Sequence, residues 1–187
     1  MENKLRCILF CTRNKDNKNI NGFKQRSKTF LSRDSLSDIK KDFEKFANKG
    51  VDGEFSRLYI SVNARDEEKV KKQLMHELID NNVDLAHIKS KLVSIASKSN
   101  CRLEKKWMFD FDSQDEQLLE KFIKDLSDTI QIDKNDATIE SHKTPNGYAI
   151  IVDKGFDTRE LLKKYDFVEL KRDDLLCIYW YKNDRTI

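Results

Sequence analysis

The stretch Lys105–Asp112, with the sequence KKWMFDFD, constrains the fold of this chain more than any other segment. Its aromatic residues predict a buried β-strand, and successive side chains of a strand point to opposite faces. The three aromatic side chains then share one face, which we expect to pack against helices. Met108, Asp110 and Asp112 share the other face. Paired carboxylates are unfavourable in a core but common where a divalent metal is held, so this strand predicts both a helix-covered sheet and a candidate site.

The segments around this strand follow a β-α-β-β-α-β order. Hydrophobic spacing and turn residues predict a strand over 102–112, a helix over 114–128, a hairpin of 137–143 and 147–153, a helix over 157–164, and strand over 167–182 that includes a hairpin around Arg172–Asp174. The first hairpin turns at Thr144–Gly147, where Asn-Gly is expected to supply the positive φ angles of a tight reversal. This order is ferredoxin-like, and it makes the first and third strands central neighbours.

The first hundred residues predict a second α/β unit. We expect a strand over 4–12, a long loop over 13–34, a helix over 35–48, a strand over 54–63, and helices over 65–81 and 84–98. The predicted fold class is therefore α+β, with an RRM-like half at about 102–182 packed with an N-terminal α/β half. We divide the chain into modules 1–100 and 101–187, which together form one compact domain.

The segment 4–33 is strongly basic, although the whole chain has a formal net charge of only +3. It contains nine Lys and Arg residues against one acid, Asp16. Basic residues with interspersed aromatics suit a polyanion, because its phosphates release counterions when cations approach. We expect Lys24, Arg26 and Lys28 to bind nucleic acid; a solvated flexible loop is the alternative.

Composition restricts where such a protein acts. No run of eighteen apolar residues exists, so the sequence predicts no contact with a membrane interior. The N-terminal segment lacks the features of a secretory signal, and four cysteines without one indicate reduced thiols in the cytoplasm. Cys7 and Cys11 are expected to be buried thiols rather than a metal pair. His76 and His87 fall on helix patterns and are expected to be packing or surface residues.

One face of the C-terminal sheet is predicted to carry the site. Strand alternation places six polar residues there: Asp110, Asp112, Glu140, His142, Glu169 and Lys171. We expect Asp110, Asp112 and Glu169 to hold Mg²⁺ or Mn²⁺, because a hard cation relieves carboxylate repulsion. His142 is expected to hydrogen-bond phosphate, and Lys171 and Arg172 to neutralise it. The alternative is an ordinary solvated face of an antiparallel sheet.

At these residues the chain resembles the archaeo-eukaryotic primase superfamily, which includes small primase-polymerase-like proteins of phages and mobile elements. The matching motifs are Phe109–Asp112, for the Asp-x-Asp of that family, and Thr144–Ala149, for a Ser/Thr-Gly-x-Gly-x-His type signature. The resemblance covers about 54–182. It implies metal-dependent nucleotidyl transfer with a nucleoside triphosphate or nucleic acid, a later acid matched by Glu169 or, second, Asp173, and substrate contacts at Thr144 and Asn146.

The chain departs from that pattern at Ala149, where the family has a histidine that contacts nucleotide phosphates. His142 on the adjacent strand is the candidate replacement. Without one, the fold and the metal site are expected to persist without polymerisation.

Four other functions match parts of the sequence less well. A nucleic-acid-binding protein without catalysis is the main alternative, although RRM strands usually present aromatics rather than paired aspartates. A metal nuclease would use Glu169–Lys171 as a Glu-x-Lys motif with Asp112 as its upstream acid. A long stretch of sequence that contains a hairpin separates the two, which makes this arrangement unattractive. A phosphatase motif at Asp110–Asp112 would be expected at the start of a domain. His142–Thr144 resembles half of a two-histidine phosphodiesterase site, whose second half is absent.

Overall fold

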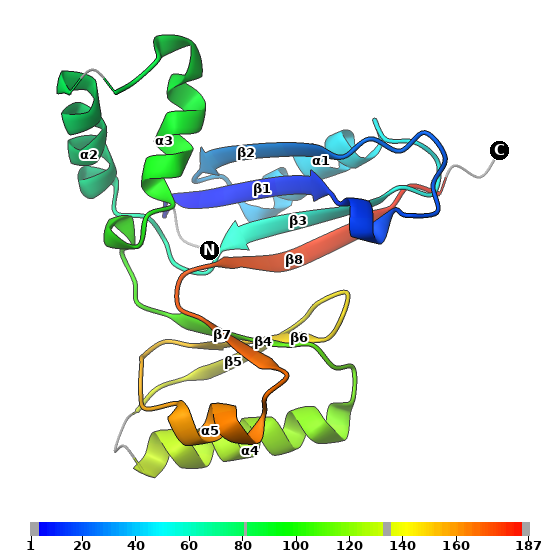
Figure 1. Cartoon of the computed structure of the whole chain (residues 1–187), viewed down its shortest axis with the longest axis vertical. Coiled ribbons are helices and arrows are strands. Elements are labelled where there is room, and N and C mark those ends of the chain that lie inside the picture. The colour runs from blue at the N-terminus through cyan, green and yellow to red at the C-terminus, as the bar shows by residue number, and fades with distance from the viewer. Residues whose placement is uncertain (1–3, 81, 133–135, 185–187) are drawn as a thin grey trace.

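Two four-stranded antiparallel sheets make up the centre of the molecule (Figure 1). The structure, a computed structural model, describes residues 4–80, 82–132 and 136–184. The first sheet has the order β2 (Arg26–Ser32), β1 (Arg6–Thr12), β3 (Phe55–Ser61) and β8 (Leu175–Lys182). The second has the order β5 (Ile139–Lys143), β6 (Tyr148–Val152), β4 (Trp107–Phe111) and β7 (Val168–Lys171).

Helices cover the sheets on their outer sides. The α-helices are α1 (Leu36–Ala47), α2 (Glu67–Ile79), α3 (Ile88–Ala96), α4 (Glu116–Ile132) and α5 (Arg159–Lys164), and the short 3₁₀ helices are η1 (Asn14–Asp16), η2 (Leu85–His87) and η3 (Ser99–Cys101). Figure 1 shows α4 and α5 beneath the second sheet, α1 behind the first, and α2 and α3 at one end of it. None of the helices in the described residues has the length and apolar composition required to cross a bilayer.

The C-terminal half has the expected βαββαβ arrangement. β4 lies between β6 and β7, so the first and third strands of the unit are central neighbours. Phe109 and Phe111 face the helices and pack with Phe122 of α4 in a buried cluster. The alternation in the KKWMFDFD segment is thereby confirmed, although β4 itself begins only at Trp107.

The last strand does not form the hairpin predicted around Arg172–Asp174. β7 pairs with β4, whereas β8 pairs with β3 and completes the first sheet. The chain therefore crosses from one sheet to the other at these residues, and a division into 1–100 and 101–187 separates β8 from its own sheet. The turn between β7 and β8 is short enough for a hairpin, but Asp173 is anchored elsewhere.

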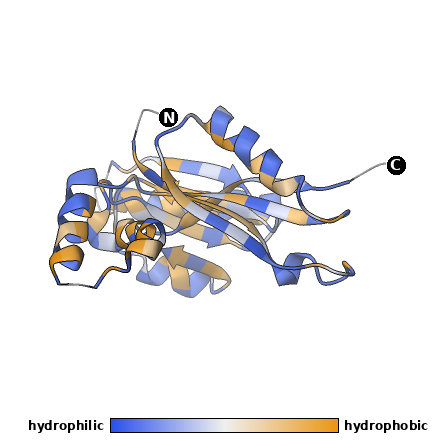
Figure 2. Cartoon of the chain, turned by 90° about the horizontal axis from the view of Figure 1, so that it is seen from above, coloured by the Kyte–Doolittle hydropathy of each residue, from blue (hydrophilic) through white to orange (hydrophobic). Residues whose placement is uncertain are grey.

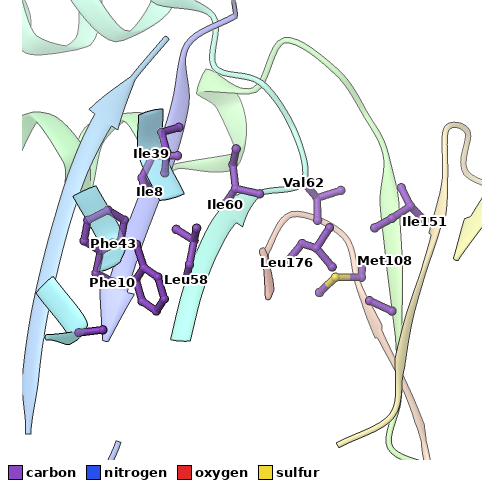
Figure 3. Close-up of a cluster of buried hydrophobic side chains, with 12 residues drawn as sticks. Ile8, Phe10, Ile39, Phe43, Leu58, Ile60, Val62, Met108, Ile151 and Leu176 are labelled. Carbon is purple, nitrogen blue, oxygen red and sulfur yellow. The ribbon is translucent and has the colours of Figure 1, made fainter. Parts of the chain in front are cut away.

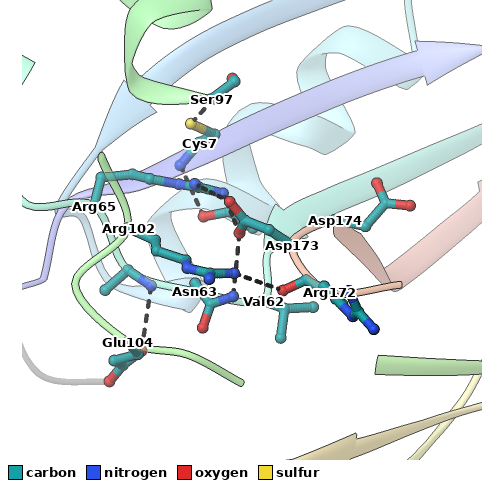
Figure 4. Close-up of polar contacts among 12 residues, drawn as sticks. Cys7, Val62, Asn63, Arg65, Ser97, Arg102, Glu104, Arg172, Asp173 and Asp174 are labelled. Carbon is teal, nitrogen blue, oxygen red and sulfur yellow. Dashed lines mark hydrogen bonds and ion pairs between the residues drawn. The ribbon is translucent and has the colours of Figure 1, made fainter. Parts of the chain in front are cut away.

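Asp173 is held at the junction of the two sheets (Figure 4). Arg65 donates to it through both terminal nitrogens, at 2.9 and 3.1 Å, and the two side chains are only 2% and 7% exposed. Asn63 also donates to Asp173, and its own carbonyl accepts from the Lys106 N–H. Asp173, the second match for the late acid of the primase family, is thus held in a buried ion pair at this junction.

The prediction of a long loop over 13–34 is wrong for the second half of that segment, where Arg26–Ser32 form β2. In β2 the Phe30 ring contacts the Phe10 ring edge-on at 5.1 Å, and Lys28 lies over the Phe30 ring. β2 is an edge strand in which Ser27, Lys28 and Thr29 are exposed. Because polar residues occupy most of its positions, the alternation that marks a strand is hidden in the sequence.

The two sheets share a hydrophobic core. Figure 3 shows Leu176 of β8 beside Met108 of β4, with Ile151 of β6 next to them. These residues are buried in one cluster with Phe10 and Phe43 of the N-terminal half. Figure 2 shows hydrophobic positions concentrated along the central strands, with hydrophilic positions alternating on the helices.

Candidate functional site

A cleft of about 490 Å³ lies between the two sheets. Residues from β1, η1, β3 and β8 form one wall, and residues from β4, β6, β7 and the β5–β6 turn form the other. Six of the residues predicted from the sequence line it together: Asp110, Asp112, Thr144, Asn146, Glu169 and Lys171. These six residues, which come from separate parts of the sequence, therefore border one cleft.

The carboxylate wall is built by strand register. Asp110 of β4 is directly opposite Glu169 of β7, so their Cβ atoms are about 5 Å apart and the like charges repel. Asp112 follows the end of β4 and is exposed. Its carboxylate makes no hydrogen bond or ion pair within the part of the chain that the structure describes.

Lys171 compensates this negative charge. Its Nζ lies 2.7 Å from Asp110 Oδ2 and 3.7 Å from both Glu169 Oε2 and Asp174 Oδ2. Burial acts to lower the pKa of Lys171, but the hydrogen bond to Asp110 and the nearby carboxylates outweigh it, so the pKa is raised above its usual value. Lys171 consequently stays charged at neutral pH.

The carboxylates do not form a complete metal cage. Among the described residues, no three His, Cys, Asp or Glu side chains are grouped closely enough to hold a metal ion. Asp110, Asp112 and Glu169 share one cleft without converging on one point. Their oxygen donors nevertheless suit Mg²⁺, which is commonly bound by one or two carboxylates together with water and substrate phosphates.

The opposite wall is basic. Arg13 and Lys15 belong to the basic segment 4–33, whereas Arg57 lies outside it and was not predicted. Arg13, Lys15 and Arg57 line the cleft there. Asp16 holds both arginines through four hydrogen bonds, with Arg13 Nε and Nη2 at 2.7 and 3.0 Å and Arg57 Nε and Nη2 at 2.9 and 2.7 Å. One signal was available, since strand alternation places Arg57 on the same face of β3 as Phe55 and Tyr59.

Asp16 does not use all the donors of the two arginines that line the cleft. Each guanidinium uses Nε and Nη2 for Asp16, so its other terminal nitrogen is not engaged by that carboxylate. Burial acts to raise the pKa of Asp16, but the hydrogen bonds from Arg13 and Arg57 prevail and lower it. Two arginines and one aspartate leave a net positive wall that is oriented before any ligand arrives.

The β5–β6 turn closes one end of the cleft through Thr144 and Asn146. Gly147 is required there for close approach, because a Cβ at this position would lie 2.1 Å from the Phe111 carbonyl oxygen. The positive φ expected at the turn is not found at Gly147, since the glycines with positive φ are Gly22 and Gly53. Gly147 thus packs the turn against the end of β4, next to Asp112.

His142 does not line this cleft. It is opposite Ala149 in the β5–β6 register, and Ala149 is opposite Asp110, so the three residues form a row across the sheet. His142 instead lines a separate pocket of about 200 Å³ with Glu140, and its Nε2 lies 3.6 Å from Glu140 Oε2. The expected grouping of His142 with the aspartates is therefore not found in one pocket.

Arg172 and Arg26 also differ from expectation. The Arg172 guanidinium lies over the Trp107 ring at 5.1 Å, outside the cleft lining. Arg26 is paired with the buried carboxylate of Glu54, donates to the Phe46 carbonyl at 3.0 Å, and lies over the Phe46 ring. Both arginines have structural contacts, whereas Lys24 and Lys28 are exposed.

The cysteines and remaining histidines agree with expectation. Cys7, Cys11, Cys101 and Cys177 are free and buried. Burial raises the pKa of Cys177, which lines the cleft, to about 11. A thiol with this pKa is a poor nucleophile at neutral pH. His76 and His87 are exposed on the surface.

Comparison of the chain with protein-family models and with curated protein sequences found no match.

Proposed function

We propose that the cleft binds a nucleotide polyphosphate together with Mg²⁺ or Mn²⁺, as a nucleotidyl-transfer protein of the primase-polymerase kind would. One observation carries this proposal: a single cleft has carboxylates on one wall and two oriented arginines on the other. A metal-bound polyphosphate needs both kinds of wall, because it presents a cation and several anionic oxygens at once. The motifs at Phe109–Asp112 and Thr144–Ala149, which resemble that family, support the same conclusion.

The two walls have different roles in this proposal. Asp110 and Asp112 would hold the metal ion, with Glu169 as a further oxygen donor. When bound there, such an ion would neutralise phosphate charge and would lower the pKa of an attacking hydroxyl. Arg13, Lys15 and Arg57 neutralise phosphate charge, and the planar guanidinium groups also orient phosphate oxygens. Thr144 and Asn146 offer hydrogen-bonding groups to the rest of the nucleotide.

Ala149 limits what the cleft offers chemically. The family has a phosphate-contacting histidine where this chain has Ala149, and His142 faces a different pocket. The arginine wall supplies positive charge in its place. Binding of a metal-nucleotide complex therefore follows more directly from the geometry than polymerisation does.

Nucleotide binding with and without metal tests the proposal. Nucleoside triphosphate is titrated into the protein with Mn²⁺, with Mg²⁺ or with a chelator. Asp112→Asn and Lys15→Met are suitable variants, because both residues are exposed and line the cleft. We expect metal to strengthen binding, and each variant to weaken it about tenfold, the equivalent of roughly 1.4 kcal/mol. The exposed Glu120→Gln on α4 is the matched control. Binding that ignores metal and both variants would contradict the proposal.

A second candidate is nucleic-acid binding without catalysis, which the exposed Lys18, Lys24 and Lys28 favour. Affinity for single-stranded nucleic acid should then fall as the salt concentration rises. The slope of log K against log salt concentration should become shallower by about 0.7 for each phosphate contact that is removed. The double variant Lys24→Ala, Lys28→Ala is expected to reduce the slope by about 1.4. A slope unchanged by this double variant would argue against these lysines.

A primer-synthesis assay with labelled nucleotides separates the two candidates. Incorporation that is lost in Asp110→Asn identifies the transferase. Salt-dependent binding without incorporation identifies the binding protein.

A further inference from the structure

We propose that Lys171 is a built-in competitor for the divalent cation, so that the ion binds only when the ammonium group leaves Asp110. This inference rests on the proposed function, because it concerns the same carboxylate wall. It goes beyond that function by predicting that the cleft resists a free cation and accepts one more readily together with a polyanion.

The geometry around Asp110 carries the first step. Strand register makes Asp110 and Glu169 face each other, and Lys171 follows Glu169 by two residues on the same strand face. Its ammonium lies 2.7 Å from Asp110 and 3.7 Å from Glu169. The Lys171 and Asp110 side chains are 24% and 29% exposed, so solvent screens this pair only in part. The wall is therefore charge-compensated without any metal.

The second step is exclusion. An ammonium and a divalent cation attract the same carboxylate oxygens and repel each other at short range. A metal ion bound by Asp110 thus has to displace Lys171, and its observed affinity is reduced by the strength of the Lys171–Asp110 contact. Asp112 makes no such contact among the described residues, so it remains free to bind the ion first.

The third step concerns where Lys171 goes. Asp174 lies 3.7 Å from the ammonium, is 46% exposed and lines the same cleft. A lysine side chain is flexible enough to change partners without backbone movement. Once released, its charge stays within the cleft, where a phosphate group would attract it. A cation that arrives with a polyphosphate therefore offers Lys171 a new partner, which a free cation does not.

Calorimetric titration with Mn²⁺ alone tests the competition. We expect Lys171→Met to bind Mn²⁺ at least tenfold more tightly than the wild type. Lys15→Met removes the same charge from the opposite wall and should tighten binding less than threefold. The double variant Lys171→Met, Asp110→Asn should lose the gain. Equal or weaker binding by Lys171→Met would overturn the inference while the proposed function stands.

A second measurement uses only the wild-type protein, and so does not depend on the folding of a variant. The rate of Lys171 acetylation by a water-soluble amine-acylating reagent is followed by peptide mass spectrometry. Saturating Mn²⁺ should raise this rate severalfold at Lys171 and leave it unchanged at the exposed Lys124. No change at Lys171, with Mn²⁺ bound, would overturn the inference. No Mn²⁺ binding by any form would instead overturn the metal site of the proposed function, and the inference with it.

Discussion

At the scale of single residues, the β5–β6 turn depends on the absence of one side chain. Gly147 lies against the backbone of Phe111 and Ser113, which an added Cβ would approach to 2.1 and 2.8 Å. Backbone atoms at the end of a central strand cannot retreat as a flexible side chain can. The position of Thr144 and Asn146 in the cleft therefore follows from a contact that only glycine permits.

Replacing this glycine tests the packing of the turn. Gly147→Ala should lower the free energy of unfolding by about 2 kcal/mol, because the turn must move away from β4. Gly22→Ala is the control, since Gly22 has φ of 73° but no atom near an added Cβ; it should lose about 1 kcal/mol through backbone strain alone. Urea denaturation measures both. A Gly147→Ala protein as stable as the wild type would contradict the assigned contact.

Asp16 offers a test of the basic wall through pH. Its pKa is lowered in the folded protein, so its ion pairs contribute fully above the ordinary carboxyl pKa of about 4 and are lost as the pH falls through the lowered value. Asp16→Asn should therefore lower the free energy of unfolding by about 1 kcal/mol at pH 7, a figure that allows for the partial exposure of Asp16 to the cleft. The difference from wild type should shrink at pH 3. Denaturation curves at both pH values check this, and a difference that grows in acid would be inconsistent with the sign.

At the scale of elements, β2 shows that residues of one basic segment can differ in their structural contacts. Arg26 at its start neutralises Glu54, whose side chain is only 2% exposed. Lys28 extends over the Phe30 ring and remains exposed. Arg26 and Lys28 carry the same charge, but in the folded strand Arg26 pairs with a buried carboxylate whereas Lys28 remains exposed.

Stability measurements separate these roles. Arg26→Ala leaves the buried Glu54 carboxylate without its guanidinium and should cost about 3 kcal/mol. Lys24→Ala, at an exposed position just before the strand, should change stability by less than about 0.5 kcal/mol. Chemical denaturation of both variants makes the comparison. Equal effects would mean that Arg26 is not an anchor of β2.

The same elements show what sequence alone can predict. The two faces of β4 could be predicted from strict alternation, because its aromatic residues lie at every second position and the acidic residues lie between them. β2 was missed because polar residues hide its period. The sheet that contains β8 was not predictable, since a short turn serves a hairpin and a crossing equally well. The Arg13–Asp16–Arg57 clamp depends on the pairing of β1 with β3, and local pattern does not encode that pairing.

At the scale of the whole molecule, the two sheets are joined by a shared core and by the chain itself, because β8 follows the second sheet in sequence but belongs to the first. Met108 and Ile151 from one sheet are buried with Leu176 from the other. The Arg65–Asp173 pair fixes the point where the chain crosses. Loss of either sheet would expose part of the other, so we expect them to unfold together.

Two tryptophans allow a direct test, because Trp107 lies in β4 and Trp180 in β8. Trp107→Phe and Trp180→Phe leave one fluorescent reporter in each sheet. When Met108→Ala is added to each single-tryptophan protein, each should show one unfolding transition. The free energy of unfolding should fall by the same amount in both, about 3 kcal/mol. Urea titrations followed by fluorescence supply the comparison. Separate midpoints for the two reporters would show that the sheets unfold independently.

The placement of β8 also bears on synthesis. A ribosome makes β1, β2 and β3 long before it makes β8, and the complete second sheet precedes β8 as well. A nascent chain that ends before residue 175 therefore has a three-stranded first sheet, and lacks the Leu175, Leu176 and Cys177 side chains that border the cleft. The cleft is therefore complete only after the final strand is made, and protein shortened at this point is expected to pair its open β3 edge with other chains.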